Sequence, residues 1–523
     1  MWLVQSYLKR AVARYPNHPA VVDPEQSFSY SQLADKLNHL TSALLAGGVS
    51  HRQPVPVLLP KSCLSVAVLL SVAQAGAFYV PLNPDQPPAR LGHLLQRLNA
   101  ALVISDAQGQ QILSTAGFAG QVWVAEDLLQ QPLQPELMAR RQHLLLDTDP
   151  LYCNFTSGST GEPKGVLISQ RSVVDFIEAF VPLAGLSHTS VIGNQAPYDF
   201  DVFVKDLYGS LCCGATLVLI PTPYFTQPAR LLDYICDQQV DTLIWAVSAL
   251  CLISMLKGFS YRVPRQLRQV LFSGEPMPLK QLKIWMDHLP QTRFINLYGP
   301  TEITCNCTYF EVPGPQALSA PLPIGRPFAN EAVFLLDDRD QQITAPEQEG
   351  QLCVAGTCLA LGYYMDPVRT AEHFTLNPLN PAFPERIYRT GDMAYYRPDG
   401  NLMFTGRRDG QIKLMGHRIE LGEIEAALEL QPAVERACCI FDRRRQRLLA
   451  FAVPQPQLVA LLPLDLPVRA QKISVTEQQL QEALRALLPH YMVPQRIYWY
   501  RTLPLNPHGK LDRASLSKRY EEA

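Results

Sequence analysis

The chain has 523 residues, of which 47% are hydrophobic and 18% are charged, and its formal net charge is -2. This length allows roughly two to four domains, each large enough to bury its own core. The composition is typical of a globular enzyme rather than a disordered chain, and the small net charge excludes a global field that would favour nucleic acid or an anionic membrane.

The twelve cysteines predict neither a disulfide framework nor a zinc site. Cys305 and Cys307 are followed by no histidine cluster at zinc spacing. The N-terminus lacks a signal peptide, and no apolar run is long and unbroken enough to span a bilayer. We therefore expect free thiols, a cytoplasmic location and no membrane partner. Two adjacent pairs in apolar surroundings are typical of small buried hydrophobic side chains: Cys212 and Cys213, and Cys438 and Cys439.

Apolar periodicity predicts alternating helices and strands in the first part of the chain. Residues 31–45 have helical spacing, and residues 55–59 form a short apolar run between two prolines. This alternation predicts an α/β fold in which parallel or mixed sheets are covered by helices. Further strands are expected at 217–220, 242–245, 269–272 and 294–297, and further helices at 231–239 and 279–288.

The sequence changes character after residue 405, where GRRDG forms a polar, glycine-bounded break. Beyond it we expect a helix at 421–430, strands at 437–441 and 448–453, and a proline-rich loop at 454–467. Thr476 and Gln479 fit a capping box for a further helix that Pro489 ends. We therefore predict a large N-terminal domain of sheets covered by helices, residues 1–408, and a small C-terminal α/β domain, residues 409–523.

The most specific local pattern is FTSGSTGEPKG, at residues 155–165. Its glycines and hydroxyl side chains predict a turn rich in free backbone N–H groups, which can wrap phosphate oxygens while Lys164 neutralises their charge. It is not a Walker loop, because neither Ser nor Thr follows the lysine. A plain linker is the alternative, but the apolar runs on both sides favour a phosphate site between two strands. The candidate phosphate-binding residues are Thr156, Ser157, Gly158, Ser159, Thr160, Gly161 and Lys164.

This loop resembles the signature loop of the superfamily of acyl- and aryl-CoA synthetases, luciferases and nonribosomal adenylation domains. The resemblance continues in order through nearly the whole chain, from Phe28 to Arg513. It implies an ATP-dependent ligase that forms an acyl-adenylate, releases pyrophosphate and uses Mg²⁺.

The segment NLYGPTE, at residues 296–302, resembles the adenine and magnesium motif. The resemblance implies that Tyr298 stacks on adenine, that Thr301 contacts the α-phosphate and that Glu302 holds Mg²⁺, with Asn296 and Gly299 in the same nucleotide site. A carboxylate suits a hard cation bound to ATP phosphates. Taken alone, however, Glu302 would more often be a capping or surface acid.

Three later segments resemble further motifs. In YRTGD, at residues 388–392, Asp392 would accept hydrogen bonds from both ribose hydroxyls, and Arg407 is assigned to the same nucleotide site. In the GRRDG break, Asp409 matches the hinge about which the small domain rotates between two half-reactions. In NPHGKLDR, Lys510 matches the adenylation lysine, which makes it a candidate catalytic residue together with Thr301 and Glu302. His508 stands where the family usually has Asn.

The segment APYDFD, at residues 196–201, indicates the amino-acid-activating branch. There the final Asp opens a helix and binds the substrate α-ammonium, and Asp201 matches that position. A helix cap is the alternative role, and the two roles are compatible. The resemblance carries the pocket-lining positions over to Val202, Lys205, Trp245, Leu271, Ser273, Leu297, Cys305 and Asn306.

Two of these positions bear on the substrate side chain. Lys205 lies four residues after Asp201 and so on the same helix face, where it would either pair with Asp201 or point at a polar or acidic substrate group. Trp245 would shorten the pocket. Together they favour a small polar amino acid such as serine, or an acidic one.

The chain ends soon after Lys510 without a carrier motif of the type GGxS. We therefore expect a separate phosphopantetheinylated carrier protein as the acceptor. A D-alanine–carrier-protein ligase of cell-wall modification is a close alternative, because FSGE at residues 272–275 and DLY at residues 206–208 also resemble that group. An acyl- or aryl-CoA ligase is disfavoured by Asp201. A catalytically silent binding homologue is disfavoured by the joint presence of Lys164, Glu302, Asp392 and Lys510.

Overall fold

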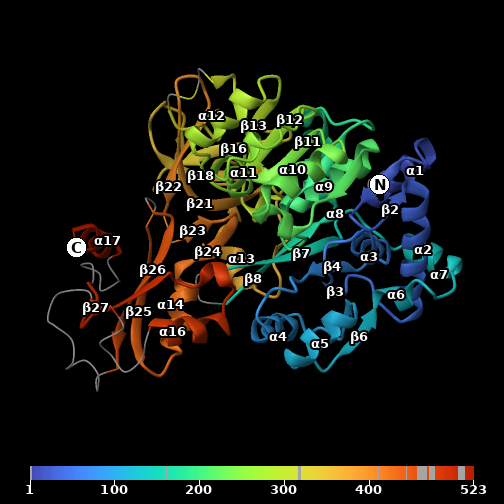
Figure 1. The fold of residues 1–523 in the computed structure, drawn as a ribbon, viewed down its shortest axis with the longest axis horizontal. Helices are drawn as coiled ribbons and strands as arrows, with labels where there is room; N and C mark the ends of the chain where they lie inside the picture. Colours follow the sequence, from blue (N-terminus) through green and yellow to red (C-terminus); the bar gives the residue numbers. More distant parts are fainter. Residues whose placement is uncertain are drawn as a thin grey trace.

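The structure is a computed structural model, and it describes residues 3–158, 162–315, 318, 320–408, 411–442, 445–455, 468–469, 477–504 and 513–522. Its strands form three large sheets and two small ones, with helices packed around them (Figure 1). The predicted α/β fold, with a large N-terminal domain and a small C-terminal domain, is confirmed.

The largest sheet has a parallel centre with antiparallel strands at both edges. Its spatial order is β15 (Arg326–Pro327), β14 (Thr308–Glu311), β13 (Arg293–Tyr298), β12 (Gln269–Ser273), β11 (Thr242–Ala246), β9 (Val191–Asn194), β10 (Thr216–Leu219), β1 (Pro19–Val22) and β2 (Ser27–Ser29).

The second sheet is also mixed, because two antiparallel strands extend a parallel set at one edge. Its order is β19 (Gly362–Tyr363), β8 (Lys164–Ser169), β7 (Pro150–Thr156), β4 (Phe78–Pro81), β3 (Pro54–Leu58), β5 (Leu102–Ser105) and β6 (Gln121–Val124).

The third sheet is antiparallel throughout. It consists of β17 (Gln342–Ile343), β16 (Glu331–Leu336), β18 (Gly350–Gly356), β21 (Arg386–Tyr396) and β20 (Phe374–Leu376), with β22 (Leu402–Arg407) paired to β21.

The small domain begins with a hairpin and continues into a four-stranded sheet, at the left of Figure 1. The hairpin is β23 (Gln411–Leu414) with β24 (His417–Glu420), and the sheet is β25 (Val434–Asp442), β26 (Arg447–Pro454), β28 (Arg496–Trp499) and β27 (Val468–Arg469).

The helices begin and end at recognisable signals. Ser29 and Gln32 form a capping box at the start of α2, and Gly214 ends α9 in the left-handed conformation. The described α-helices are α1 (Gln5–Arg14), α2 (Tyr30–Ala46), α3 (Cys63–Gln74), α4 (Pro88–Arg97), α5 (Ala107–Thr115), α6 (Ala125–Leu128), α7 (Pro135–Gln142), α8 (Gln170–Ala184), α9 (Val202–Cys213), α10 (Pro228–Asp237), α11 (Val247–Met255), α12 (Leu279–His288), α13 (Pro367–His373), α14 (Leu421–Glu429), α16 (Glu477–Arg485) and α17 (Arg513–Glu522).

One hydrophobic core joins the three large sheets, since Val57 on β3, Ile244 on β11 and Val354 on β18 belong to the same buried cluster. The small domain has a separate core, in which Ile424 on α14 packs with Trp499 on β28. Among the helices that the structure describes, each is too short or too polar to cross a membrane.

Candidate active site

The predicted phosphate loop joins β7 to the antiparallel strand β8, as the sequence indicated. Thr156 at the end of β7 pairs with Lys164 at the start of β8. A Cβ atom on Gly158 would lie 2.0 Å from the carbonyl oxygen of Glu162, so only glycine fits this turn. The Thr156 hydroxyl is buried and has no hydrogen-bond partner among the described residues, which suits a ligand oxygen. The other three predicted loop residues lie outside the described part of the chain: Ser159, Thr160 and Gly161.

A buried cluster of charges surrounds Glu302, which is fully inaccessible to solvent. The Lys164 ammonium lies 3.2 Å from its Oε1 atom, and the Tyr363 hydroxyl donates to the same oxygen at 2.9 Å. The Arg418 guanidinium donates to both carboxylate oxygens, at 2.9 and 2.8 Å. Burial alone would raise the pKa of the Glu302 carboxyl, but the charges of Arg418 and Lys164 hold it well below its ordinary value. Glu302 is therefore ionised.

The same cluster changes the titration of Lys164. Burial and the nearby positive charge of Arg418 lower its pKa to about 8, although Glu302 opposes that shift. Strand pairing explains how the cluster assembles, because β19 carries Tyr363 and pairs with β8 beside Lys164. The backbone N–H of Ala360, just before β19, also donates to the Glu302 carbonyl oxygen at 2.9 Å.

The predicted ribose ligand Asp392 is fixed by two side chains. It lies directly opposite Arg407 in the β21–β22 ladder, and the Arg407 guanidinium donates to Asp392 Oδ1 at 2.6 Å. The Tyr298 hydroxyl donates to Oδ2. Burial and the Asp392 charge raise the pKa of Tyr298 well above its ordinary value, so this phenol stays protonated. The Asp392 carboxylate is thus held in a fixed position by two donors.

Two further residues of the 296–302 motif, Asn296 and Gly299, make close contacts with neighbouring backbone. The Asn296 amide donates to the carbonyl oxygen of Pro323 at 2.8 Å and thereby holds the neighbouring loop. A Cβ atom on Gly299 would lie 2.5 Å from the Cα atom of Asn306, so glycine is required at that position too. These contacts give Asn296 and Gly299 structural roles at the site.

Asp201 immediately precedes α9, but its side chain forms no capping hydrogen bond. Instead its carboxylate accepts a hydrogen bond from the Thr301 side chain and lies close to the charge of Lys205. Burial raises the pKa of Asp201, while these two neighbours lower it. Because its carboxylate is not used as a cap, Asp201 retains acceptor capacity for a ligand cation.

The other predicted pocket residues on α9 and after Thr301 also meet. The buried Lys205 ammonium donates to Asn306 Oδ1 at 2.6 Å, and the Cys305 thiol donates to the carbonyl oxygen of Asp201 at 3.1 Å. Thr304 and Cys305 have φ values of 58° and 75°, which are unfavourable for side chains of this kind. Such strained backbone clusters at functional sites. Val202 is half-buried and packs against the main core.

The strand register separates the remaining predicted pocket residues into two groups. Leu271 is paired with Ile244, and Ser273 with Ala246, while Trp245 is paired with Phe272 on the opposite face. Leu271 and Leu297 accordingly belong to the main core. Trp245 belongs to a second core instead, where its indole N–H donates to the carbonyl oxygen of Gly193 at 2.7 Å. The expectation that Trp245 shortens the pocket is therefore wrong.

Three residues of this site were missed by the sequence analysis: Tyr363, Lys413 and Arg418. Lys413 is solvent-accessible, but the surrounding protein lowers its pKa and the charges of Asp392 and Asp201 oppose that shift. No local pattern could have singled out Arg418, because its partner Glu302 is 116 residues away. The predicted hinge residue Asp409 and adenylation lysine Lys510 lie outside the described residues.

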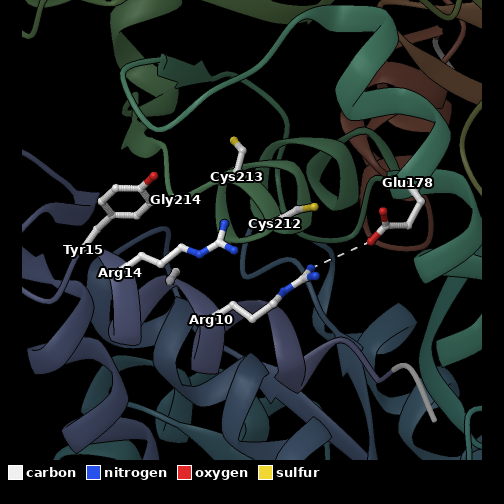
Figure 2. A pocket seen from close by; sticks show the side chains of 8 residues that line it. Arg10, Arg14, Tyr15, Glu178, Cys212, Cys213 and Gly214 are labelled. Atoms are coloured by element: carbon white, nitrogen blue, oxygen red, sulfur yellow. Dashed lines mark ion pairs between the residues drawn. The ribbon is translucent and has the colours of Figure 1, made fainter.

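A cavity of about 150 Å³, whose lining residues are drawn in Figure 2, lies at the C-terminal end of α9. It is lined by both cysteines at the end of α9 and by Arg10 and Arg14 on α1. Arg10 faces Glu178 across it at 3.8 Å. Since α9 has 12 residues, the cavity lies about 18 Å from the Asp201 end of the helix. None of the predicted site residues lines it.

Comparisons with known proteins show the family to which the chain belongs. A family model described as AMP-binding enzyme matches residues 8–364, and one described as AMP-binding enzyme C-terminal domain matches residues 423–510. Tyrocidine synthase 1 of Brevibacillus parabrevis is 30% identical over 505 residues, which cover 96% of this chain and 44% of that protein. Phosphinothricin tripeptide synthetase PhsC of Streptomyces viridochromogenes is 34% identical over 524 residues, with 97% and 44% covered. The chain thus spans less than half the length of either relative.

Solved structures are similar over nearly the whole chain. NpsA-ThdA of Klebsiella oxytoca, an artificially fused adenylation–PCP di-domain, has a TM-score of 0.80 and 25% identity, with 95% of this chain and 93% of that chain covered. The Vibrio cholerae adenylation domain AlmE in complex with glycyl-adenosine-5'-phosphate has a TM-score of 0.83 and 22% identity. The match covers 99% of this chain and 98% of AlmE and shows that the two share a fold. The chain therefore belongs to the AMP-binding enzyme family.

Proposed function

We propose that the protein activates an amino acid with ATP to form aminoacyl-AMP, releases pyrophosphate, and transfers the aminoacyl group to the phosphopantetheine thiol of a separate carrier protein. The observation that carries the amino-acid assignment is the carboxylate of Asp201. It is crowded by protein, is not used as a helix cap, and lies beside Thr301 of the nucleotide motif. An anion in that position suits the α-ammonium of an amino acid.

The residues present fit ATP and Mg²⁺. The buried Thr156 hydroxyl, which has no partner among the residues that the structure describes, and the glycine-only turn at Gly158 suit phosphate oxygens. The fixed Asp392 carboxylate suits ribose hydroxyls, with Tyr298 beside it for the base. Arg418 occupies both Glu302 oxygens in this structure, and they would suit a hard cation once this small-domain residue has moved away. The cation, when bound, would neutralise phosphate charge.

Adenylation and transfer would use one site in turn. First, an oxygen of the substrate carboxylate attacks the α-phosphorus of ATP, and the bond to the departing pyrophosphate breaks. We assign Lys510 to binding the negative charge that develops. The carrier thiol, as its thiolate, then attacks the acyl carbon, and AMP leaves. Residues 409–523 would rotate about Asp409 between these steps and exchange Lys510 for the carrier arm.

The buried Lys205–Asn306 pair supports a polar substrate side chain, because both groups have further hydrogen-bonding capacity. We propose a small polar amino acid such as serine, or an acidic one. Trp245 does not support a small substrate side chain, because its own side chain lies in the second core. The fused adenylation–PCP relative supports a carrier protein as the acceptor.

Pyrophosphate exchange tests the activation step directly. The protein is assayed with the common L- and D-amino acids and with matched carboxylic acids that lack the amine. Exchange with one amino acid, and none with its deamino analogue, is expected. Preference for the deamino acids would overturn the amino-acid assignment, and preference for D-alanine would identify the cell-wall type of ligase.

Carrier loading tests the second step. Mass spectrometry of phosphopantetheinylated carrier proteins, incubated with the enzyme, ATP and its amino acid, should show the aminoacyl adduct. Coenzyme A serves as the competing acceptor. Efficient formation of free aminoacyl-CoA would instead make the enzyme a CoA ligase.

A further inference from the structure

The small domain places a carboxylate against the phosphate loop. Glu423, in the first turn of α14, forms a buried ion pair with Arg90 on α4, and their side chains are 2% and 11% exposed. The backbone N–H of Gly158 also acts on this carboxylate: burial raises the pKa of Glu423, whereas Arg90 and the Gly158 N–H lower it. The Glu423 Oε2 atom is buried and accepts no hydrogen bond from the described residues. An anion of the protein itself therefore lies beside the Gly158 N–H of the loop and the Arg90 guanidinium.

The loop is bonded to the small domain a second time, through Ser157. Its hydroxyl donates to the Arg418 carbonyl oxygen at 2.6 Å and accepts from the Glu420 N–H at 3.2 Å. A predicted phosphate-loop hydroxyl is thus engaged by the backbone of the β23–β24 hairpin.

A second small-domain side chain occupies the residue proposed to bind Mg²⁺. Arg418 follows the hairpin turn and holds both oxygens of Glu302, the residue proposed to hold Mg²⁺. With both oxygens engaged by a guanidinium, and Oε1 also by Tyr363 and Lys164, the carboxylate has little capacity left for a metal ion.

These contacts together place a protein anion at the proposed phosphate position and a protein cation at the proposed metal position. We propose that Glu423 and Arg418 form an interdomain latch that competes with Mg-pyrophosphate for the large domain. The inference rests on the proposed function. The small domain reaches the arrangement of this structure only after pyrophosphate has left, and closing of the latch then disfavours pyrophosphate rebinding and reversal of adenylation.

Linkage makes the competition reciprocal: if Mg-pyrophosphate weakens the latch, the latch weakens Mg-pyrophosphate binding by the same factor. The apparent dissociation constant is the intrinsic one divided by the fraction of molecules with an open latch. Removing one latch charge should therefore tighten Mg-pyrophosphate binding. Since charged hydrogen bonds contribute about 1.5–3 kcal/mol, the expected gain is roughly tenfold or more.

The test uses the full chain with the variants Glu423→Gln and Arg418→Gln. Both changes are on the small domain, so neither removes a large-domain ligand of pyrophosphate. Glu435→Gln and Arg436→Gln are matched controls, because both residues are exposed on β25. Mg-pyrophosphate affinity is measured by titration calorimetry. Hydrogen exchange of a peptide spanning 411–422 reports the latch, since the Glu420 N–H is bonded to Ser157 in the closed arrangement.

In the wild type, adding Mg-pyrophosphate should increase exchange in this peptide. Each latch variant should show faster exchange without ligand and about tenfold tighter binding, whereas the controls should match the wild type. Circular dichroism shows whether each variant is folded, and either variant alone suffices for the test. Unchanged or weaker binding in a folded variant would overturn the latch and leave the proposed function standing. Failure of the wild type to bind Mg-pyrophosphate at all would overturn both.

Discussion

The guanidinium of Arg418 and the carboxylate of Glu302 join the two domains through two hydrogen bonds, at 2.9 and 2.8 Å, within a buried site. Lys164 shares the same carboxylate from the phosphate loop. One acid therefore balances two cations that come from opposite sides of the domain boundary.

The first prediction is that Glu302→Gln destabilises the protein. The change leaves Arg418 and Lys164 buried without their counter-charge, and breaking such a pair costs about 3–5 kcal/mol. A lower Tm is expected by scanning calorimetry, together with loss of protection in the 411–422 peptide. Glu435→Gln is the control for the change of charge. A Tm equal to that of the wild type would show that the cluster contributes no stability.

The second prediction concerns Asp201→Asn. The amide still accepts a hydrogen bond from Thr301 but lacks the charge that would bind the α-ammonium. Since a charged hydrogen bond contributes about 1.5–3 kcal/mol, the KM for the amino acid should rise about 10- to 100-fold while the KM for ATP stays unchanged. Pyrophosphate exchange at varied concentrations of each substrate separates the two constants. Normal amino-acid activation by this variant would remove Asp201 from the substrate site.

The third prediction separates the two half-reactions. Lys510→Ala should slow adenylation by about 10²–10³ yet spare thioester formation from supplied aminoacyl-AMP, because loss of one electrostatic contact to a developing charge costs about 2.7–4 kcal/mol. Asp409→Pro should do the reverse, because proline restricts the backbone angles of a hinge. Single-turnover assays of each step distinguish them. Equal loss of both steps in each variant would contradict the assignment.

The fourth prediction concerns pH and His417, whose ring lies between the domains. It stacks on Tyr491 at a centroid distance of 3.5 Å and meets the edge of Phe200 at 4.8 Å. Burial, together with the neighbouring His490, lowers the pKa of His417 to about 3. When the small domain is detached from the large one, His417 is exposed and has an ordinary pKa of about 6.5. Between pH 3 and pH 6.5, the docked arrangement of the two domains therefore binds fewer protons than the detached one. Docking is therefore strongest above about pH 6.5 and weakens as the pH falls.

Protection factors of the 411–422 peptide, corrected for intrinsic exchange, should accordingly fall between pH 7 and pH 5. His417→Phe keeps the ring contacts and removes the titration, so its protection should depend much less on pH. The same pH dependence in both proteins would rule out His417 as its source.

The fifth prediction is that Glu331→Gln stabilises the protein at neutral and higher pH. Glu331 is 8% exposed, and within the described part of the chain neither carboxylate oxygen has a hydrogen-bond partner. Burial, with a contribution from Asp175, raises its pKa well above the ordinary value of 4.5. The folded state thus binds more protons than the unfolded state, and stability falls as the pH rises above 4.5.

Thermal unfolding at pH 4 and pH 8 measures this effect. Glu331→Gln should match the wild type at pH 4 and have the higher Tm at pH 8. A variant with the same or a lower Tm at pH 8 would show that ionisation of Glu331 does not lower the free energy of unfolding.

The sequence predicted helices and strands well where nearby residues, such as helix caps, set their ends. The helix expected at 279–288 is α12, without displacement, and the strands expected at 242–245 and 269–272 are β11 and β12, each one residue longer. The helix expected at 31–45 is α2, which begins one residue earlier because its capping box begins at Ser29, and which ends one residue later. Thr476 and most of the proline-rich loop at 454–467 lie outside the described residues.

The candidate site was predicted only in part, because its contacts depend on distant segments. Motif resemblance brought Glu302, Asp392 and Asp201 into consideration but indicated none of the small-domain groups that face them. The pair of Arg90 and Glu423 spans 333 residues, and no local pattern encodes such docking. Trp245 was misplaced for a different reason: only the pairing of β11 with β12 shows which face each side chain occupies.

That pairing has a consequence for changing the specificity of the enzyme. Leu271 and Ser273 share one face of the sheet, and Trp245 and Phe272 fill the core behind it. If this face lines the substrate pocket as proposed, substitutions at the first two positions would reshape the pocket while the packing behind it remains intact. A redesign that changes consecutive residues of β12 would instead disturb both faces, because neighbouring side chains point to opposite sides of the sheet. Libraries for new substrates should therefore vary every second residue of this strand.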